Sequence, residues 1–377
     1  MSAPRLEINL QKLHHNARTL VKRLAGQGIA VTGVSKATLG MFEIVHTWLG
    51  AGVGSIGESR IETIEALVRS GITVPLLLVR SPMLSQVDRV VASASISCNT
   101  DLGVLNALAA AAKQQGRRHG VLLMVELGDL REGILPADLE SVAQQILAMA
   151  NLQLMGIGTN LGCQNGIAPD AQNMGDLSRL TTALEQRFHL TLPWCSGGNS
   201  ANLPWLAAGG DPARINHLRL GEALLLGREP LHRTAIPGLH TDAISLVAEV
   251  IEATHKPSQP WGERGRTSFE GSPSAPRREG SSQRVQRALL ALGEQDVDPA
   301  GLIPPRGTVI RGASSDHLVV ESPGQRLAVG DEQRYQLSYS ALLRAMTSPF
   351  VDRCLVDGSS IAPSARCRWW GLLDGGA

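Results

Sequence analysis

The sequence predicts an α/β protein with an N-terminal (β/α)8 TIM-type barrel followed by a mostly β C-terminal domain. Between residues 30 and 226, short apolar runs alternate with amphipathic stretches, which is typical of parallel strands joined by crossover helices. Eight such repeats in roughly 200 residues favour closure into a barrel. After about residue 236 the pattern changes to short strands separated by Gly and Pro turns.

The predicted barrel strands are short apolar segments that lie at residues 30–35, 53–57, 75–80, 95–98, 119–126, 152–159, 191–196 and 215–220. Helices are expected between them, for example at 58–69, 101–115, 136–149 and 175–187. In these stretches apolar residues such as Ile61 and Ile64 recur at spacings of three and four. The fourth strand is short and polar, so a doubly wound open sheet is the structural alternative.

We assign residues 1–235 to the barrel and 236–357 to the β domain, with residues 5–10 as a candidate strand that pairs with the β domain. Strands are expected at 244–253, 308–311, 318–321 and 332–337. The stretch Lys256–Gln286 is rich in Pro, Gly, Ser and Arg, which predicts a long loop. Residues 358–377 show no periodicity and are expected to form a tail.

Composition excludes several classes of protein. A formal net charge of +1 and 3% aromatic residues argue against a nucleic-acid partner. Apolar runs end well before the length of about 20 residues that spans a membrane, and the N-terminus has no signal-peptide pattern. The five cysteines lack a CxxC pair, so neither a disulfide framework nor a metal site is expected, and the cytoplasm is the default compartment.

Lys36 closes the first barrel strand, after the apolar run Ile29–Ser35. A strand-end lysine can simply extend to water. A partly desolvated lysine can instead attack a carbonyl and form a Schiff base. Because catalytic groups of such barrels lie at the carboxyl ends of the strands, Lys36 is a candidate catalytic residue.

Two turns at the same predicted rim are candidate phosphate sites. Ser196-Gly-Gly-Asn-Ser200 follows a strand and opens a helix, and Gly221-Glu222 follows the eighth strand. Glycines permit close backbone approach, and a helix N-terminus offers free N–H groups to an anion. The alternative for the first turn is an ordinary helix cap.

Two arginines also fall at this rim. Arg219 ends the eighth strand, and Arg131 lies in a glycine-bracketed loop where it suits a carboxylate or phenolate partner. Either could be a solvated surface charge. A Schiff-base lysine, a phosphate cradle and inward arginines together suit pyridoxal 5′-phosphate (PLP).

On these residues the chain resembles the PLP-dependent alanine racemase superfamily, and within it the ornithine racemase group. The stretches that carry the resemblance run from residue 5 to about 355, and the combination is specific although each piece alone is not. They are Glu7–Leu10 with Asn16, Val34–Ala37, Arg80–Met83, Val125–Gly133, Gly156–Leu161, Ser196–Ser200, Leu218–Glu222, Gly312–His317 and Tyr339–Leu343.

The resemblance implies a PLP barrel followed by a β domain, assembled as a homodimer in which the partner's β domain completes each site. Lys36 would carry the cofactor as an aldimine. Arg219 would bond the pyridine nitrogen and keep it unprotonated. Ser200, Gly221 and Glu222 would hold the phosphate, the last two through backbone N–H groups.

Other residues match the family's substrate-facing positions. Arg131 would contact the phenolic oxygen of the cofactor and the substrate carboxylate. Ser315 and Asp316 match the β-domain turn that closes the site. Asn160 stands where alanine racemase has a histidine under the pyridine ring.

The chain departs from alanine racemase most at the second catalytic base, which is a tyrosine in that enzyme. The matching segment, Pro260–Thr267, contains no tyrosine. Gly40 also replaces the tyrosine four residues after the catalytic lysine. Tyr339, in a matched stretch, is the preferred candidate for the second base, with His317 as its rival. The alternative for Tyr339 is a half-buried aromatic residue of the β domain.

The predicted activity is interconversion of L- and D-amino acids, most directly of ornithine or a related basic amino acid. The terminal ammonium of such a substrate needs an acidic partner, for which Asp296 and Asp316 are candidates; the alternative is turn-capping aspartates. An alanine or broad-specificity racemase is the alternative activity. A PLP-binding protein without activity and a PLP decarboxylase are the competing classes.

Overall fold

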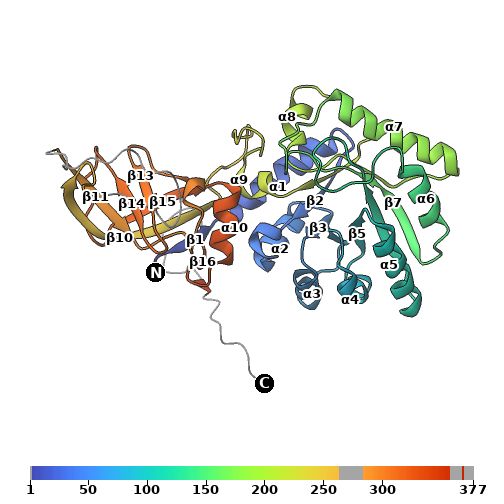
Figure 1. Cartoon of the computed structure of the whole chain (residues 1–377), viewed down its shortest axis with the longest axis horizontal. Coiled ribbons are helices and arrows are strands. Elements are labelled where there is room, and N and C mark those ends of the chain that lie inside the picture. The colour runs from blue at the N-terminus through green and yellow to red at the C-terminus, as the bar shows by residue number, and fades with distance from the viewer. Residues whose placement is uncertain (1, 263–282, 357–366, 369–377) are drawn as a thin grey trace, which may run out of the picture. The chain divides into compact units, whose positions relative to one another are not determined.

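The structure, a computed structural model, describes residues 2–262, 283–356 and 367–368. The chain divides into two compact units. One is Lys12–His240, and the other combines Met1–Gln11 with Thr241–Ala377. Figure 1 shows the elements of both units.

The first unit is a closed barrel of eight parallel strands, which confirms the predicted fold class. Its strands follow chain order around the barrel: β2 (Ala30–Val34), β3 (Ser55–Glu58), β4 (Leu76–Leu78), β5 (Ile96–Asn99), β6 (His119–Met124), β7 (Leu152–Gly158), β8 (Trp194–Ser196) and β9 (His217–Leu220). Strand β9 pairs with β2 and closes the ring. The open-sheet alternative is therefore wrong, and the short polar segment around β5 is a barrel strand that pairs with both neighbours.

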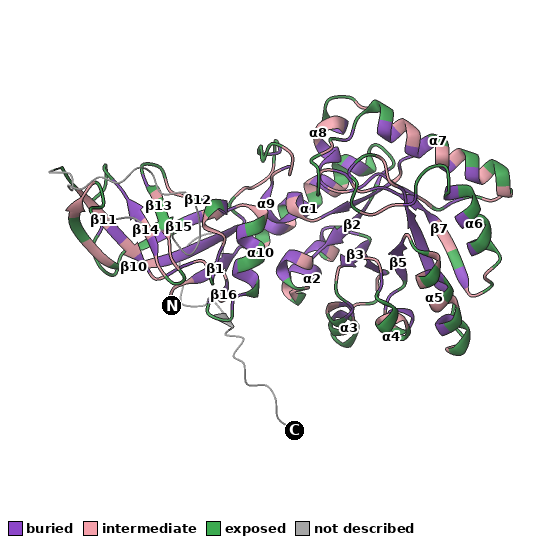
Figure 2. Ribbon diagram, viewed as in Figure 1, coloured by how far each residue is buried: buried purple, intermediate pink, exposed green. Residues whose placement is uncertain are grey.

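Helices connect the strands and turn their apolar sides to the barrel, as the colouring by burial shows (Figure 2). They are α1 (Leu10–Ala25), η1 (Lys36–Thr38), α2 (Phe42–Gly50), α3 (Ile61–Arg69), η2 (Leu84–Gln86), α4 (Val87–Ser93), α5 (Leu102–Gln114), α6 (Leu139–Leu147), α7 (Ala171–Phe188), α8 (Asn202–Ala207) and α9 (Glu222–Leu226). Asp101 and Asp170 cap the N-termini of α5 and α7 with their side chains. No helix in the described part of the chain is long and apolar enough to span a membrane.

The second unit contains a nine-stranded sheet with the order β13-β14-β11-β10-β1-β16-β17, and β15 pairs with β10 and β12. Its elements are β1 (Arg5–Ile8), β10 (Ile244–Pro257), β11 (Arg284–Leu290), η3 (Pro299–Gly301), β12 (Leu302–Ile303), β13 (Val309–Ala313), β14 (Leu318–Glu321), β15 (Glu332–Leu337), α10 (Tyr339–Thr347), β16 (Asp352–Leu355) and β17 (Cys367–Arg368). Strand β1 inserts between β10 and β16, so the first residues of the chain belong to this sheet.

Three expectations about the second unit need correction. The predicted loop Lys256–Gln286 begins and ends in the paired strands β10 and β11, while residues 263–282 lie outside the described residues. The predicted tail contains β17, which pairs with β16. Cys354 is disulfide-bonded, although the cysteine spacing gave no indication of a disulfide.

A β-bulge in β7 depends on Gly156. Strand β6 pairs Val121 with Leu154 and Leu122 with Gly156, so Met155 is an extra residue. Gly156 has a φ of 151°, which residues with a Cβ rarely adopt. A Cβ at this position would lie 1.8 Å from the carbonyl oxygen of Trp194 in β8. The β7–β8 pairing therefore requires glycine here.

We predict that Gly156→Ala destabilises the barrel by more than about 3 kcal/mol, because the new methyl group overlaps the neighbouring strand and strains the backbone. Gly54→Ala is the matched control, since a Cβ there meets nothing within 4 Å. Thermal unfolding followed by circular dichroism measures both. Equal midpoints for the two variants would contradict the steric account.

Candidate active site

Lys36 lies at the carboxyl end of β2 as the first residue of η1, with a partly buried side chain. The backbone around it is fixed: Ser35 N donates to Gly57 O at 3.1 Å, and Thr38 Oγ1 donates to Ser35 O at 2.9 Å. The sequence contains four other lysines, at 12, 22, 113 and 256, and none of them follows a barrel strand. Lys36 is therefore the one lysine placed where barrel chemistry takes place.

Arg219 reaches the same rim from inside the barrel. The residue is only 5% exposed, and its guanidinium donates to Ser196 Oγ and, at 2.6 Å, to Thr159 O. Burial lowers the pKa of Arg219. It forms no ion pair with a carboxylate among the described residues. A buried cation with only neutral acceptors is suited to a further electron-rich ligand.

His217 is linked to Arg219 through the hydroxyl of Ser196. Its Nδ1 is hydrogen-bonded to Ser196 Oγ at 2.8 Å, and its Nε2 to Thr32 Oγ1 at 2.7 Å. Trp194 stacks on the ring with centroids 4.1 Å apart. Burial lowers the pKa of His217 to about 3, so the ring is neutral. A neutral histidine holds Ser196 without adding a second charge beside Arg219.

The two predicted phosphate turns also lie at this rim. Ser200 Oγ accepts the backbone N–H of Ala223 at 3.2 Å, which joins the turn after β8 to the turn after β9. Gly221 packs closely against the end of β2: a Cβ at this position would lie 3.0 Å from Val34 O. Burial raises the pKa of Glu222 to about 7, so this carboxyl is largely protonated below neutral pH and then adds no charge against an anion.

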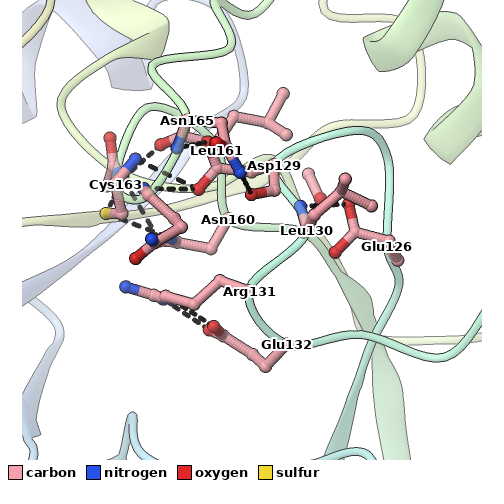
Figure 3. A network of polar contacts seen from close by, with 12 residues as sticks. Glu126, Asp129, Leu130, Arg131, Glu132, Asn160, Leu161, Cys163 and Asn165 are labelled. Carbon is pink, nitrogen blue, oxygen red and sulfur yellow. Dashed lines mark hydrogen bonds and ion pairs between the residues drawn. The ribbon is translucent and has the colours of Figure 1, made fainter.

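Asp129 organises the loop after β7. Its carboxylate accepts the backbone N–H groups of Cys163, Gln164, Asn165 and Ile167 at 3.2, 2.9, 3.1 and 3.4 Å (Figure 3). Burial acts to raise the pKa of Asp129, but these four hydrogen bonds outweigh it and lower the pKa. The loop is therefore built around one ionised carboxylate.

Asn160 and Arg131 lie beside this loop. Asn160 Nδ2 donates to Cys163 Sγ at 3.1 Å, and Asn160 Oδ1 accepts from Asn199 Nδ2 at 3.2 Å. Arg131 is exposed and points toward Glu132, with which it forms a two-bonded ion pair that raises its pKa (Figure 3). The charge of Glu132 also acts on Arg219, so these groups share one electrostatic environment.

Asp316 is exposed, and its Oδ1 accepts from Ser315 Oγ at 3.1 Å and contacts His317 Nδ1 at 2.9 Å. The hydrogen bond from Ser315, followed by the charge of His317, lowers the pKa of Asp316. Tyr339 is the half-buried first residue of α10.

Asp296, the other candidate for the substrate ammonium, lies inside the second unit. It is buried, its Oδ2 accepts Gly293 N at 3.2 Å, and its Oδ1 accepts Ser348 Oγ at 3.0 Å. Both oxygens therefore hold the fold of the second unit, which is the turn-capping alternative.

Sequence reasoning missed two groups near the rim. Glu58 is buried at the end of β3, and its only sequence signal was its position at a strand end. Cys163 is exposed beside Asn160, and no motif marked it. The segment Pro260–Thr267 cannot be placed as a whole, because residues 263–267 lie outside the described residues.

Comparison with known proteins identifies the family. The family described as alanine racemase, N-terminal domain, matches residues 8–229. A lysine racemase of Thermotoga maritima is 37% identical over 94% of this chain and 98% of its own length. An ornithine racemase of Acetoanaerobium sticklandii is 37% identical over 94% of this chain and 99% of its own length.

The chain belongs to the alanine racemase family. Its fold agrees with this assignment: an alanine racemase structure from Streptomyces lavendulae superimposes with a TM-score of 0.74 at 18% identity, covering 95% of this chain and 98% of that one. Family membership confirms the resemblance inferred from the lysine, arginine and glycine-turn motifs. It leaves the role of each site residue as a proposal.

We predict that Asp129→Asn loosens the loop after β7. The variant loses the charge-assisted acceptor of four N–H groups, so backbone amides at 163–167 should exchange with solvent about tenfold faster or more. Hydrogen–deuterium exchange with mass spectrometry measures this. Asp101→Asn is the control, since asparagine also caps α5. Unchanged exchange at 163–167 would contradict the role of Asp129.

Proposed function

We propose that this protein is a PLP-dependent racemase of a basic amino acid, with ornithine or lysine as its substrate. The class of enzyme, an amino-acid racemase, follows from the family. The observation that carries the PLP assignment is that Lys36 and the buried Arg219, which has no carboxylate partner among the described residues, end the adjacent barrel strands β2 and β9.

The residues of the rim fit PLP. Lys36 supplies an amine for the cofactor's aldehyde. Arg219, which has only neutral acceptors among the described residues, suits the pyridine nitrogen of PLP without protonating it. Ser200 and the backbone N–H groups of Gly221 and Glu222 suit the phosphate. When bound, PLP supplies an electron sink that makes the α-hydrogen of the substrate acidic.

Arg131 and Asn160 are assigned to the substrate side of the cofactor. Arg131 offers a planar guanidinium to the substrate carboxylate, and its ion pair with Glu132 orients that guanidinium. Asn160 offers an uncharged amide at the position where alanine racemase has a histidine. Both lie near the loop that Asp129 holds in place.

Racemisation requires proton carriers on opposite faces of the substrate. The amine of Lys36 takes or returns the α-proton on one face. Tyr339 is the first candidate for the other face, and His317 is the second. We assign the completed site to a homodimer, in which the second unit of the partner contributes the opposite-face group.

The lysine racemase and the ornithine racemase that match 94% of this chain are both named for an amino acid with a basic side chain. Asp316 is the remaining candidate for the terminal ammonium, because its carboxylate is exposed and its pKa is lowered by Ser315 and His317. Alanine and broad-specificity racemisation are the alternative outcomes of the substrate test.

We predict loss of optical rotation from L-ornithine and L-lysine in the presence of PLP. Their kcat/KM should exceed that of L-alanine by about tenfold or more, which is the value of one hydrogen bond to a charged group. Polarimetry or chiral chromatography measures it, with Lys36→Ala as the inactive control. A preference for alanine would contradict the basic-substrate assignment, and decarboxylated products would contradict racemisation.

We predict that Tyr339→Phe slows α-hydrogen exchange with deuterated solvent by about 100-fold or more for one enantiomer only, since Lys36 still serves the other. Proton NMR of each enantiomer with the variant measures this. Tyr335→Phe is the matched control, because the Tyr335 hydroxyl is buried without a hydrogen-bond partner in the described structure. If Tyr339→Phe exchanged the α-hydrogen of both enantiomers at the wild-type rate and His317→Gln lost exchange of one enantiomer, His317 would be the second proton carrier.

A further inference from the structure

Arg219 is one end of a chain of five hydrogen-bonded polar side chains that crosses the neighbouring strands β8, β9, β2 and β3. Its contacts are Arg219 to Ser196 Oγ, Ser196 Oγ to His217 Nδ1 at 2.8 Å, His217 Nε2 to Thr32 Oγ1 at 2.7 Å, and Thr32 Oγ1 to Ser55 Oγ at 2.6 Å. None of the five residues is more than 6% exposed. Because the chain is buried, an unpaired hydrogen inside it is costly.

The hydrogens of this chain point away from Arg219. A guanidinium can only donate, so Ser196 Oγ accepts from Arg219. Among the described residues, the one atom that can accept the hydroxyl hydrogen of Ser196 is His217 Nδ1. Nδ1 is then unprotonated, so the ring carries its hydrogen on Nε2 and donates it to Thr32. Thr32 in turn donates to Ser55.

The opposite direction of donation is less favourable. If Nδ1 carried the hydrogen, His217 would donate to Ser196, and the hydroxyl hydrogen of Ser196 would have no acceptor in a residue with 0% exposure. Donation away from Arg219 leaves only the hydroxyl hydrogen of Ser55 without an acceptor among the described residues, and Ser55 is the most exposed residue of the chain at 6%. A ring with both hydrogens is excluded, because burial, followed by the charge of Arg219, lowers the pKa of His217 to about 3.

The ring and the guanidinium are both held by neighbouring strands. Trp194 stacks on the His217 ring with 11° between the ring planes. The guanidinium of Arg219 also donates to Thr159 O at 2.6 Å, and it lies beside Gly158, where a Cβ would be 3.2 Å from Arg219 Nη1. Its remaining N–H groups have no acceptor among the described residues, so they are left for a ligand.

We infer that His217 is a positioning residue for Arg219: as the Nε2–H tautomer it accepts the hydroxyl hydrogen of Ser196, which keeps a lone pair of Ser196 Oγ directed at the guanidinium. Without an acceptor at Nδ1, the Ser196 hydroxyl would be free to rotate and to turn its hydrogen toward the cation or its ligand. The direction of the chain stands on the protein alone. Its consequence for PLP rests on the proposed function, in which Arg219 faces the pyridine nitrogen.

The first test locates the hydrogen on His217 in the protein without PLP. Nitrogen NMR of protein with isotope-labelled histidine rings distinguishes a ring nitrogen that carries a hydrogen from one that does not, and the signals missing from His217→Gln belong to His217. We expect the hydrogen on Nε2 and none on Nδ1 at neutral pH. A hydrogen on Nδ1, or on both nitrogens, would overturn the inference. Because no cofactor is present, this result stands whether or not the protein is a racemase.

The second test separates the hydrogen bonds of His217 from its packing, with the dissociation constant of PLP, measured by absorbance, as the readout. His217→Gln keeps one acceptor and one donor but loses the ring, whereas His217→Phe keeps a ring against Trp194 but loses both hydrogen bonds. We expect PLP to bind about tenfold more weakly to His217→Phe than to His217→Gln, which is the value of one hydrogen bond to a charged group. Equal or tighter binding by His217→Phe would show a packing role and overturn the inference.

His119→Phe is the matched control for this comparison. His119 is also buried, and its Nε2 is hydrogen-bonded to Ser97 Oγ at 2.8 Å, but this contact does not lead to Arg219. His119→Phe should bind PLP as tightly as the wild type does. If His217→Phe does not fold, the NMR measurement on the wild-type protein still decides the inference. If the wild-type protein binds no PLP, the proposed function fails, and the NMR result still decides the direction of the chain.

Discussion

The parallel pairing of β2 with β9 is the constraint on which the site depends. Gly33 pairs with Leu220, so the ends of the first and last barrel strands are neighbours although they are far apart in the sequence. This register places Lys36 beside the turn of Gly221, and Arg219 inside the ring that the pairing closes. A change in this register would separate the lysine from the candidate phosphate turn.

The barrel interior handles its buried charges in two different ways. Arg219 keeps its charge because neutral acceptors surround it and a neutral His217 holds one of them in place. At Glu58, burial raises the pKa to about 7, although the hydrogen bonds from Ser35 and Ser59 and the charge of Lys36 act to lower it. The first arrangement gives a fixed cation, which suits a constant role toward a ring nitrogen. The second gives a buried carboxyl group that is balanced between its protonated and ionised forms near neutral pH.

The sequence predicted those features that depend on local pattern. Apolar runs with turn signals identified all eight barrel strands, and strand-end positions singled out Lys36 and Arg219. The strand β11 was missed because the Pro-, Gly- and Ser-rich residues before it predicted a loop. The helix that begins at Tyr339 was missed because its first residues were interpreted as a family motif and not by their periodicity. The environments of Glu58, Asp129 and Asp296 could not be predicted, since each depends on hydrogen-bond donors that are distant in the sequence or on burial, which only the folded chain provides. The roles of Tyr339, His317 and Asp316 stay predictions.

The central claim is that Lys36 carries the cofactor, and one chemical measurement tests it most directly. The PLP-loaded protein is reduced with sodium borohydride, which fixes the cofactor to its lysine, and the digested peptides are mapped by mass spectrometry. The account predicts a pyridoxyl group on the peptide that contains Lys36 and on no other. A label on Lys12, Lys22, Lys113 or Lys256, or no label on a protein that binds PLP, would contradict it.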